Sequence, residues 1–201
     1  LEWVVSRAKN AIASKEAISI GYIGNIVDLL EHLEESNLIP DLCSDQTSLH
    51  NPWLGGYIPR NMLHSEASLM LSDEPEIFRE KVRLTLIDHA NVINRLSKKG
   101  MKFWDYGNAF LLEASRAGAD VGKDGSFRYP SYVEDIMGPM CFDYGLGPFR
   151  WVCSSGSKED LKITDDIAKQ VLLEQSSNAP DEILSQILDN IMWISNAEEY
   201  G

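Results

Sequence analysis

Apolar residues recur three and four positions apart in several stretches of the chain, which is the spacing that one buried face of an α-helix requires. This spacing predicts helices over residues 1–14, 26–36, 74–99, 109–117, 160–175 and 181–196, with a further short helix over 130–137. Gly100 follows the longest of them, where a glycine commonly ends a helix. The chain is therefore expected to be rich in helices.

Short apolar runs alternate with these helices. Residues 17–23, 39–43, 101–104 and 149–153 are compact enough for buried strands. Strands that alternate with helices favour a parallel sheet flanked by helices on both faces, an α/β fold. Between the second strand and the long helix, residues 44–64 show no regular pattern. Irregular chain of this length inside a compact domain is commonly functional.

Polar and glycine-containing segments follow each predicted strand. They are Gly24-Asn25, Ser44–His50, Asp105–Asn108 and Ser154–Gly156. Ligands of parallel sheets bind beyond the carboxyl ends of the strands, so we expect the four segments to line one crevice. The chain has no internal repeat and no linker-like stretch, which predicts a single domain over residues 1–201.

Composition narrows the function classes. The 201 residues hold 18 Lys and Arg against 31 Asp and Glu, a formal charge of −13, which argues against a general binder of nucleic-acid backbones. The uncharged run over residues 17–27 is too short to span a bilayer. Three cysteines without CxxC spacing favour a reducing cytoplasm over a disulfide framework. The chain begins without Met, and we expect it to be a piece of a longer protein.

The stretch Ser44–Pro52 is the segment richest in hydrogen-bond donors. Its backbone amides and side chains could hold a phosphate or a ribose without net positive charge. Ser, Thr and Asp suit helix caps and Asx turns equally well, so this alternative stays open. Tyr106, in the turn after the third strand, could pack on a planar ring or be an aromatic residue at the edge of the core.

Arg150 stands between apolar residues in a predicted strand, where an unpaired guanidinium is costly. It needs an anionic partner, either a carboxylate of this chain or one of a substrate. His50 could serve as an acid–base group or a ligand, but no metal-binding spacing accompanies it, and no metal site is expected. The other histidines, His32, His64 and His89, are expected on solvated helix surfaces. The three cysteines, Cys43, Cys141 and Cys153, are expected to be small buried hydrophobic residues rather than nucleophiles.

Five strings of sequence together resemble the urocanate hydratases, the urocanase family, and they come in the order of that family. They are SIGYIGN (19–25), SDQTSLHNPWLGGYIP (44–59), FWDYGNAFLLEASRAGADV (103–121), FRYPSYVEDIMGPM (127–140) and GPFRWVCSSG (147–156). The resemblance covers nearly the whole chain. It implies a Rossmann-like domain and a cytosolic homodimer that adds water to urocanate, giving 4-imidazolone-5-propanoate in histidine degradation. It also implies NAD as an electrophile rather than as a net oxidant.

The resemblance also assigns site residues. Those implied to contact NAD are Asn25, Ile26, Gln46, Thr47, Ser48, Leu49, His50, Tyr57, Ile58 and Tyr106. Arg150 matches the arginine associated with the urocanate carboxylate.

Two features of the family are absent from these residues. The Gly-rich stretch GxGGMGGAQ does not occur, and none of the three cysteines falls at the motif of the family's active-site cysteine. We therefore expect a central NAD-binding region that does not turn over urocanate alone. A non-catalytic binding or assembly module remains the alternative for the isolated chain. An ordinary NAD-dependent dehydrogenase is disfavoured, because the fingerprint GxGxxG is missing as well.

Overall fold

The computed structural model describes residues 1–45, 51–107, 109–123, 126–144 and 153–200. These residues form two compact units, Leu1–Val133 and Glu134–Gly201. The sequence predicts one domain over residues 1–201, whereas the structure separates the last helices into a unit of their own. The reason is that these helices bury their apolar residues mainly against each other.

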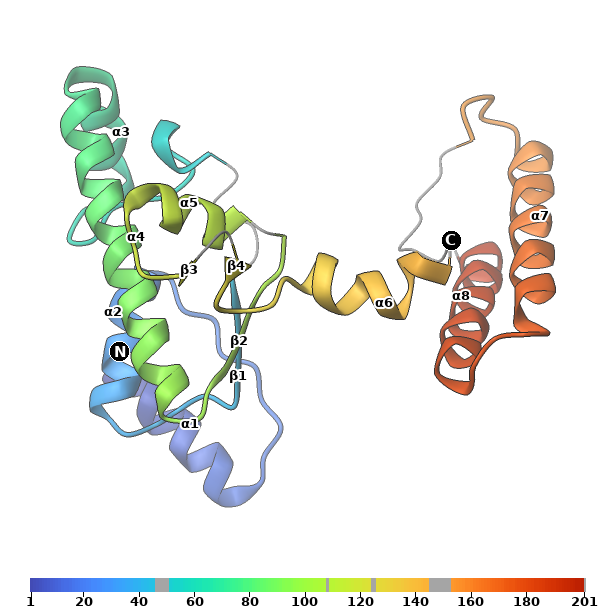
Figure 1. Ribbon diagram of the computed structural model, residues 1–201, viewed down its shortest axis with the longest axis horizontal. Coiled ribbons are helices and arrows are strands. Elements are labelled where there is room, and N and C mark those ends of the chain that lie inside the picture. Colours follow the sequence, from blue (N-terminus) through green and yellow to red (C-terminus); the bar gives the residue numbers. More distant parts are fainter. Residues whose placement is uncertain (46–50, 108, 124–125, 145–152, 201) are drawn as a thin grey trace. The chain divides into compact units, whose positions relative to one another are not determined.

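The first unit is built around one long helix, α4 (Pro75–Lys98), which Figure 1 shows with the other helices grouped about it. The remaining helices of this unit are α1 (Glu2–Ser14), α2 (Ile26–Glu35), α3 (His64–Asp73) and α5 (Ala109–Ala117), with a 3-10 turn at Pro52–Leu54. The helices predicted over 1–14, 26–36, 74–99 and 109–117 are confirmed. Helix α3 was missed because its apolar residues Leu69, Met70 and Leu71 are consecutive instead of spaced by helical turns.

Two parallel strands carry the α/β character of the unit. Strand β1 (Leu42–Asp45) pairs with β2 (Lys102–Asp105), in a register that sets Leu42 beside Lys102 and Asp45 beside Asp105. Helices α3 and α4 lie in the connection between them, as a parallel crossover requires. A second pair, β3 (Gly122–Lys123) and β4 (Ser126–Phe127), is antiparallel. The predicted α/β class is confirmed, and among the described residues two of the predicted strands form the parallel sheet.

The strand predicted over residues 17–23 is wrong. This segment is irregular and pairs with none of the described strands, and Ile23 is fully exposed at its end. A strand needs neighbouring backbones to satisfy its amides and carbonyls, so an apolar run without such a neighbour stays irregular. The strand predicted over 149–153 lies outside the described residues except for Cys153.

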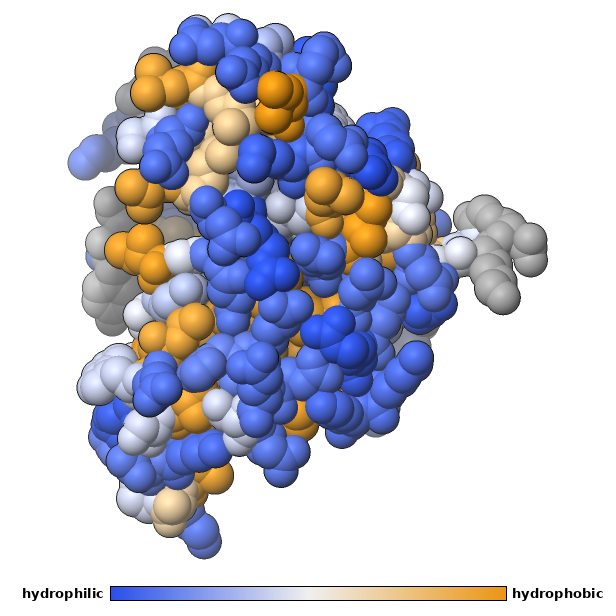
Figure 2. Space-filling view, turned by 90° about the vertical axis from the view of Figure 1, so that its left-hand side faces the viewer, coloured by the Kyte–Doolittle hydropathy of each residue, from blue (hydrophilic) through white to orange (hydrophobic). Residues whose placement is uncertain are grey.

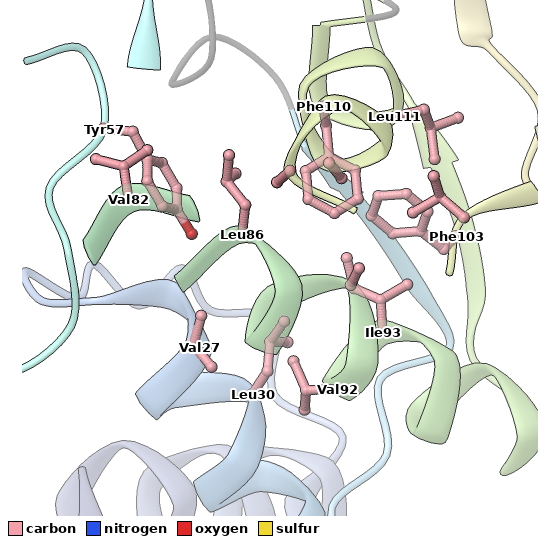
Figure 3. Close-up of a cluster of buried hydrophobic side chains, with 14 of the residues drawn as sticks. Val27, Leu30, Tyr57, Val82, Leu86, Val92, Ile93, Phe103, Phe110 and Leu111 are labelled. Atoms are coloured by element: carbon pink, nitrogen blue, oxygen red, sulfur yellow. The ribbon is translucent and has the colours of Figure 1, made fainter. Parts of the chain in front are cut away.

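Helix α4 buries side chains on most of its circumference, and α2, α5 and β2 supply the residues that cover them (Figure 3). Its buried residues include Phe78, Val82, Leu86, His89 and Ile93. The prediction of a solvated His89 is therefore wrong, because this side chain is only 2% exposed. Its position was readable from the sequence, since residues 82, 86, 89 and 93 share one helical face.

The surface of the first unit is mainly hydrophilic on the face seen in Figure 2, with separate hydrophobic patches. Scattered exposed apolar residues of this kind, such as Leu63 and Leu69, are normal for folded proteins. Among the described residues, no helix has both the length and the apolar character needed to cross a bilayer.

The second unit consists chiefly of a helix pair, α7 (Lys158–Ser176) and α8 (Asp181–Tyr200). Leu172 of α7 packs with Ile183 and Ile187 of α8, and the buried Cys141 joins this cluster. Both helices match the predicted ranges 160–175 and 181–196. Before them, a π-helical turn (Tyr132–Met137) leads into the short helix α6 (Gly138–Met140) and a 3-10 turn at Phe142–Tyr144.

Candidate functional site

The carboxyl ends of β1 and β2 lie side by side. Asp45 and Asp105 are register partners, and the amide of Tyr106 donates to the carbonyl oxygen of Asp45 at 3.0 Å. The chain beyond β1 enters residues 46–50, and the chain beyond β2 passes through Tyr106 and Gly107 into α5. Two of the predicted polar segments, Ser44–His50 and Asp105–Asn108, thus begin at the same edge of the sheet. This is the edge at which parallel sheets bind ligands.

Asp105 fixes the turn between β2 and α5. Its buried carboxylate accepts from the amide of Gly107 at 3.3 Å and from that of Leu111 at 2.9 Å. Leu111 lies in the first turn of α5, where amides have no partner inside the helix. A carboxylate there is favoured by these free amides and by the helix dipole. Asp105 received no role from the sequence, because its burial depends on packing.

Tyr106 is 42% exposed beside this turn. Its ring stacks on that of Tyr132, with ring centroids 5.2 Å apart and planes inclined by 9°. A partly exposed pair of parallel rings provides a flat aromatic surface suited to a planar ligand ring. Tyr132 was not predicted as a site residue. In the sequence, its signal was its position within the string FRYPSYVEDIMGPM. In the structure, it begins a π-helical turn, a feature often found at functional sites.

Asn25 joins two of the segments implied to bind NAD. Its Oδ1 caps α2 by accepting from the amide of Val27 at 3.0 Å, and its Nδ2 donates to the carbonyl of Ile58 at 3.1 Å. Ile26 and Ile58 both pack against the main core. The structure therefore brings residues 25–26 and 57–58 together.

Tyr57, the first residue of the segment 57–58, has its side chain in the core, as Figure 3 shows. It is 5% exposed, and its hydroxyl is 3.2 Å from Nδ1 of His89. Burial raises the pKa of Tyr57 well above its usual value, and the charge of Asp45 raises it further. The His89 ring also lies 4.7 Å from the ring of Phe110, so Tyr57 is linked through His89 to α5, the helix that follows the turn at Tyr106 and Gly107.

Side-chain contacts from Trp53 and Arg60 hold the segment of residues 51–63 in place. Trp53 donates from Nε1 to Glu113 of α5 at 2.6 Å. Arg60 reaches α2, donating to Asp28 at 2.9 Å and to Glu31 at 2.6 Å. Arg60 and Glu113 could not be predicted from the sequence. The hydrogen-bond partners of Arg60 in α2, and Trp53 as the partner of Glu113, lie about thirty or more positions away, and no local pattern marks these pairs.

The other predicted site residues, Gln46, Thr47, Ser48, Leu49, His50 and Arg150, lie outside the described residues. The described part of the chain contains no group of three or more His, Cys, Asp or Glu that could hold a metal ion. Burial, with the nearby charge of Asp45, raises the pKa of the Cys43 thiol to about 11, which keeps that thiol protonated and unreactive near neutral pH.

Comparison with known proteins gives two family matches that follow one another along the chain. The model described as "Urocanase Rossmann-like domain" matches residues 1–136, and "Urocanase C-terminal domain" matches residues 139–201. The division resembles that between the two compact units.

Similar relatives come from several organisms. A "Probable urocanate hydratase" of Dictyostelium discoideum is 52% identical over 92% of this chain and 29% of its own length. One of Caenorhabditis elegans is 48% identical over 99% of this chain and 31% of the relative. The "Urocanate hydratase" of Mus musculus is 47% identical over the whole chain and 31% of the relative. The chain thus spans less than a third of the curated relatives it matches, and from its two matched domains it belongs to the urocanase family.

Proposed function

We propose that this chain forms part of the NAD site of a urocanate hydratase, and that the whole protein adds water to urocanate to give 4-imidazolone-5-propanoate. The family matches and the names of the relatives support this reaction. The observation that carries the site is the meeting of Asp45, Asp105 and Tyr106 at the carboxyl edge of β1 and β2.

The residues at this edge fit a dinucleotide. The stacked rings of Tyr106 and Tyr132 offer a face to a planar ring. Apart from its chain neighbours, Gly107 has no atom of the described residues within 4 Å of where a side chain would begin, which leaves its backbone open to a ligand on the described side. The chain carries a charge of −13, and cofactor phosphates must therefore be met locally by amides and hydroxyls.

In this proposal, NAD supplies the electrophile for the imidazole ring of urocanate. The residues of this chain bind and orient it. Asn25 fixes the backbone at residue 58, Asp105 fixes the turn at Gly107, and the aromatic core beneath them excludes water from this side. The contacts proposed for the segment after β1 come from Gln46, Thr47, Ser48, Leu49 and His50.

Arg150 is proposed to bind the urocanate carboxylate through its guanidinium fork. A homodimer and a cytoplasmic location are further parts of the proposal, supported by the resemblance and by cysteines without CxxC spacing. The residues 1–201 are proposed to act as the NAD-binding region of a longer chain, and we expect them to be inactive by themselves.

The experiment is a measurement of NAD affinity by equilibrium dialysis of the whole protein and its variants. Loss of an aromatic contact costs about 0.5 to 1.5 kcal/mol, so Tyr106→Ala is expected to raise the Kd for NAD about two- to twelvefold. Tyr106→Phe keeps the ring and should stay near the wild type. Trp3→Ala is the control, since Trp3 is an exposed aromatic residue of α1, a helix that carries none of the proposed site residues.

Urocanate consumption, followed by its ultraviolet absorbance, gives the second readout. Wild-type protein that neither binds NAD nor consumes urocanate would refute the proposed function. Equal NAD affinity in Tyr106→Ala and wild type would remove Tyr106 from the site.

A further inference from the structure

One buried imidazole, that of His89, lies between two segments of the proposed NAD site, residues 57–58 and the first turn of α5. His89 extends from the middle of α4, and its ring lies 6.3 Å from that of Tyr57, inclined by 12°, and 4.7 Å from that of Phe110, inclined by 56°. Tyr57 belongs to the segment that Asn25 ties to α2, and Phe110 belongs to the first turn of α5, where the amide of Leu111 donates to Asp105. His89 therefore lies between the segment of Tyr57 and the start of α5.

Burial keeps both partners of this hydrogen bond uncharged. Burial lowers the pKa of His89 to about 3, so its imidazole is neutral near neutral pH. Burial also raises the pKa of Tyr57, which keeps the phenol protonated. A neutral imidazole has one donor and one acceptor nitrogen, and a phenol hydroxyl can pair with either, so Tyr57 and Nδ1 of His89 form a hydrogen bond between uncharged groups across 3.2 Å.

This bond commits the Tyr57 side chain to the core. With 5% of the residue exposed and the hydroxyl directed at His89, residue 57 can meet a ligand chiefly through its backbone. The position of that backbone then depends on the Tyr57–His89 bond on one side and on the Asn25–Ile58 bond on the other.

We propose that His89 is a positioning residue of the NAD site. Its neutral imidazole touches no ligand. It holds the backbone of residues 57–58 at a fixed distance from the turn that follows β2. The inference rests on the proposed function, because only a bound NAD makes this distance matter for affinity.

A double-mutant cycle in the whole protein tests it, with the Kd for NAD measured by equilibrium dialysis. Tyr57→Phe and His89→Phe each leave one buried polar group without its partner, and each is expected to raise the Kd about three- to tenfold. The double variant lacks the same single bond, so its Kd should be no higher than that of either single variant. His89→Asn, whose amide can pair with the Tyr57 hydroxyl as donor or acceptor, should stay within about twofold of the wild type.

Tyr129→Phe is the matched control. The Tyr129 hydroxyl donates to Oδ1 of Asn94, another residue of α4, at 2.7 Å. Its loss should lower the urea midpoint of the protein while the Kd for NAD stays unchanged. The four proteins of the cycle are also unfolded in urea without NAD, where the double variant should recover stability lost by the single variants.

The outcomes separate the two claims. If wild-type protein does not bind NAD, the proposed function fails and this inference fails with it. If wild-type protein binds NAD and the single variants bind it equally well, the inference alone is overturned. Additive losses of affinity in the double variant would overturn it too, because His89 would then act independently of Tyr57.

Discussion

The buried carboxylate of Asp105 gives the sharpest test of how the candidate site is held together. Substitution Asp105→Ala removes the acceptor for the amides of Gly107 and Leu111. Loss of a helix cap costs about 0.5 to 2 kcal/mol, and a buried amide left without a partner costs about 1 to 3 kcal/mol. Gly107 is exposed, so water can replace the carboxylate there, whereas Leu111 is buried. We therefore expect a loss of about 2 to 4 kcal/mol in the free energy of unfolding.

The assay is urea unfolding followed by circular dichroism, with wild type and variants compared at one pH. Asp105→Asn keeps an oxygen for the Leu111 amide but loses the charge, so it should cost about half as much. Asp120→Ala is the control, because that carboxylate is 62% exposed in its pair with Arg128 and such pairs contribute less than about 1 kcal/mol. A loss for Asp105→Ala no larger than for Asp120→Ala would refute the assignment of Asp105 as the anchor of this turn.

Two further predictions concern stability. Burial lowers the pKa of His89 from 6.5 to about 3, so between these values the unfolded chain binds a proton that the folded chain does not. The stability that neutral His89 contributes is fully present above pH 6.5 and is lost as the pH falls, by about 2 kcal/mol at pH 5. Urea unfolding at pH 7 and pH 5 should show this loss in the wild type. The variant His89→Asn should lack it. Arg60→Ala should lower the free energy of unfolding by about 1 to 3 kcal/mol, because the guanidinium bonds of Arg60 to Asp28 and Glu31 are partly buried. Arg79→Ala, at an exposed ion pair within α4, should lower it by less than about 0.5 kcal/mol. Similar urea midpoints for these two arginine variants would contradict the second prediction.

The sequence alone determined most of the helices, with α3 as an exception, and the family that the chain resembles. Helical spacing is a local property, so α2, α4 and α5 could be located from neighbouring residues. The strings around Asn25 and Tyr106 are contiguous, and they could be recognised without knowing where they lie in space. The rule that ligands bind at the carboxyl ends of parallel strands then placed Tyr106 at a candidate site.

Tertiary structure decided the role of each side chain. His89 and Tyr57 are 32 positions apart, and Trp53 and Glu113 are 60 apart, so no local pattern could pair them. The same holds for the apolar run over residues 17–23, which has strand-like composition but no neighbouring strand among the described residues. Burial and hydrogen bonding depend on what the folded chain brings alongside a residue, and periodicity carries no information about that partner.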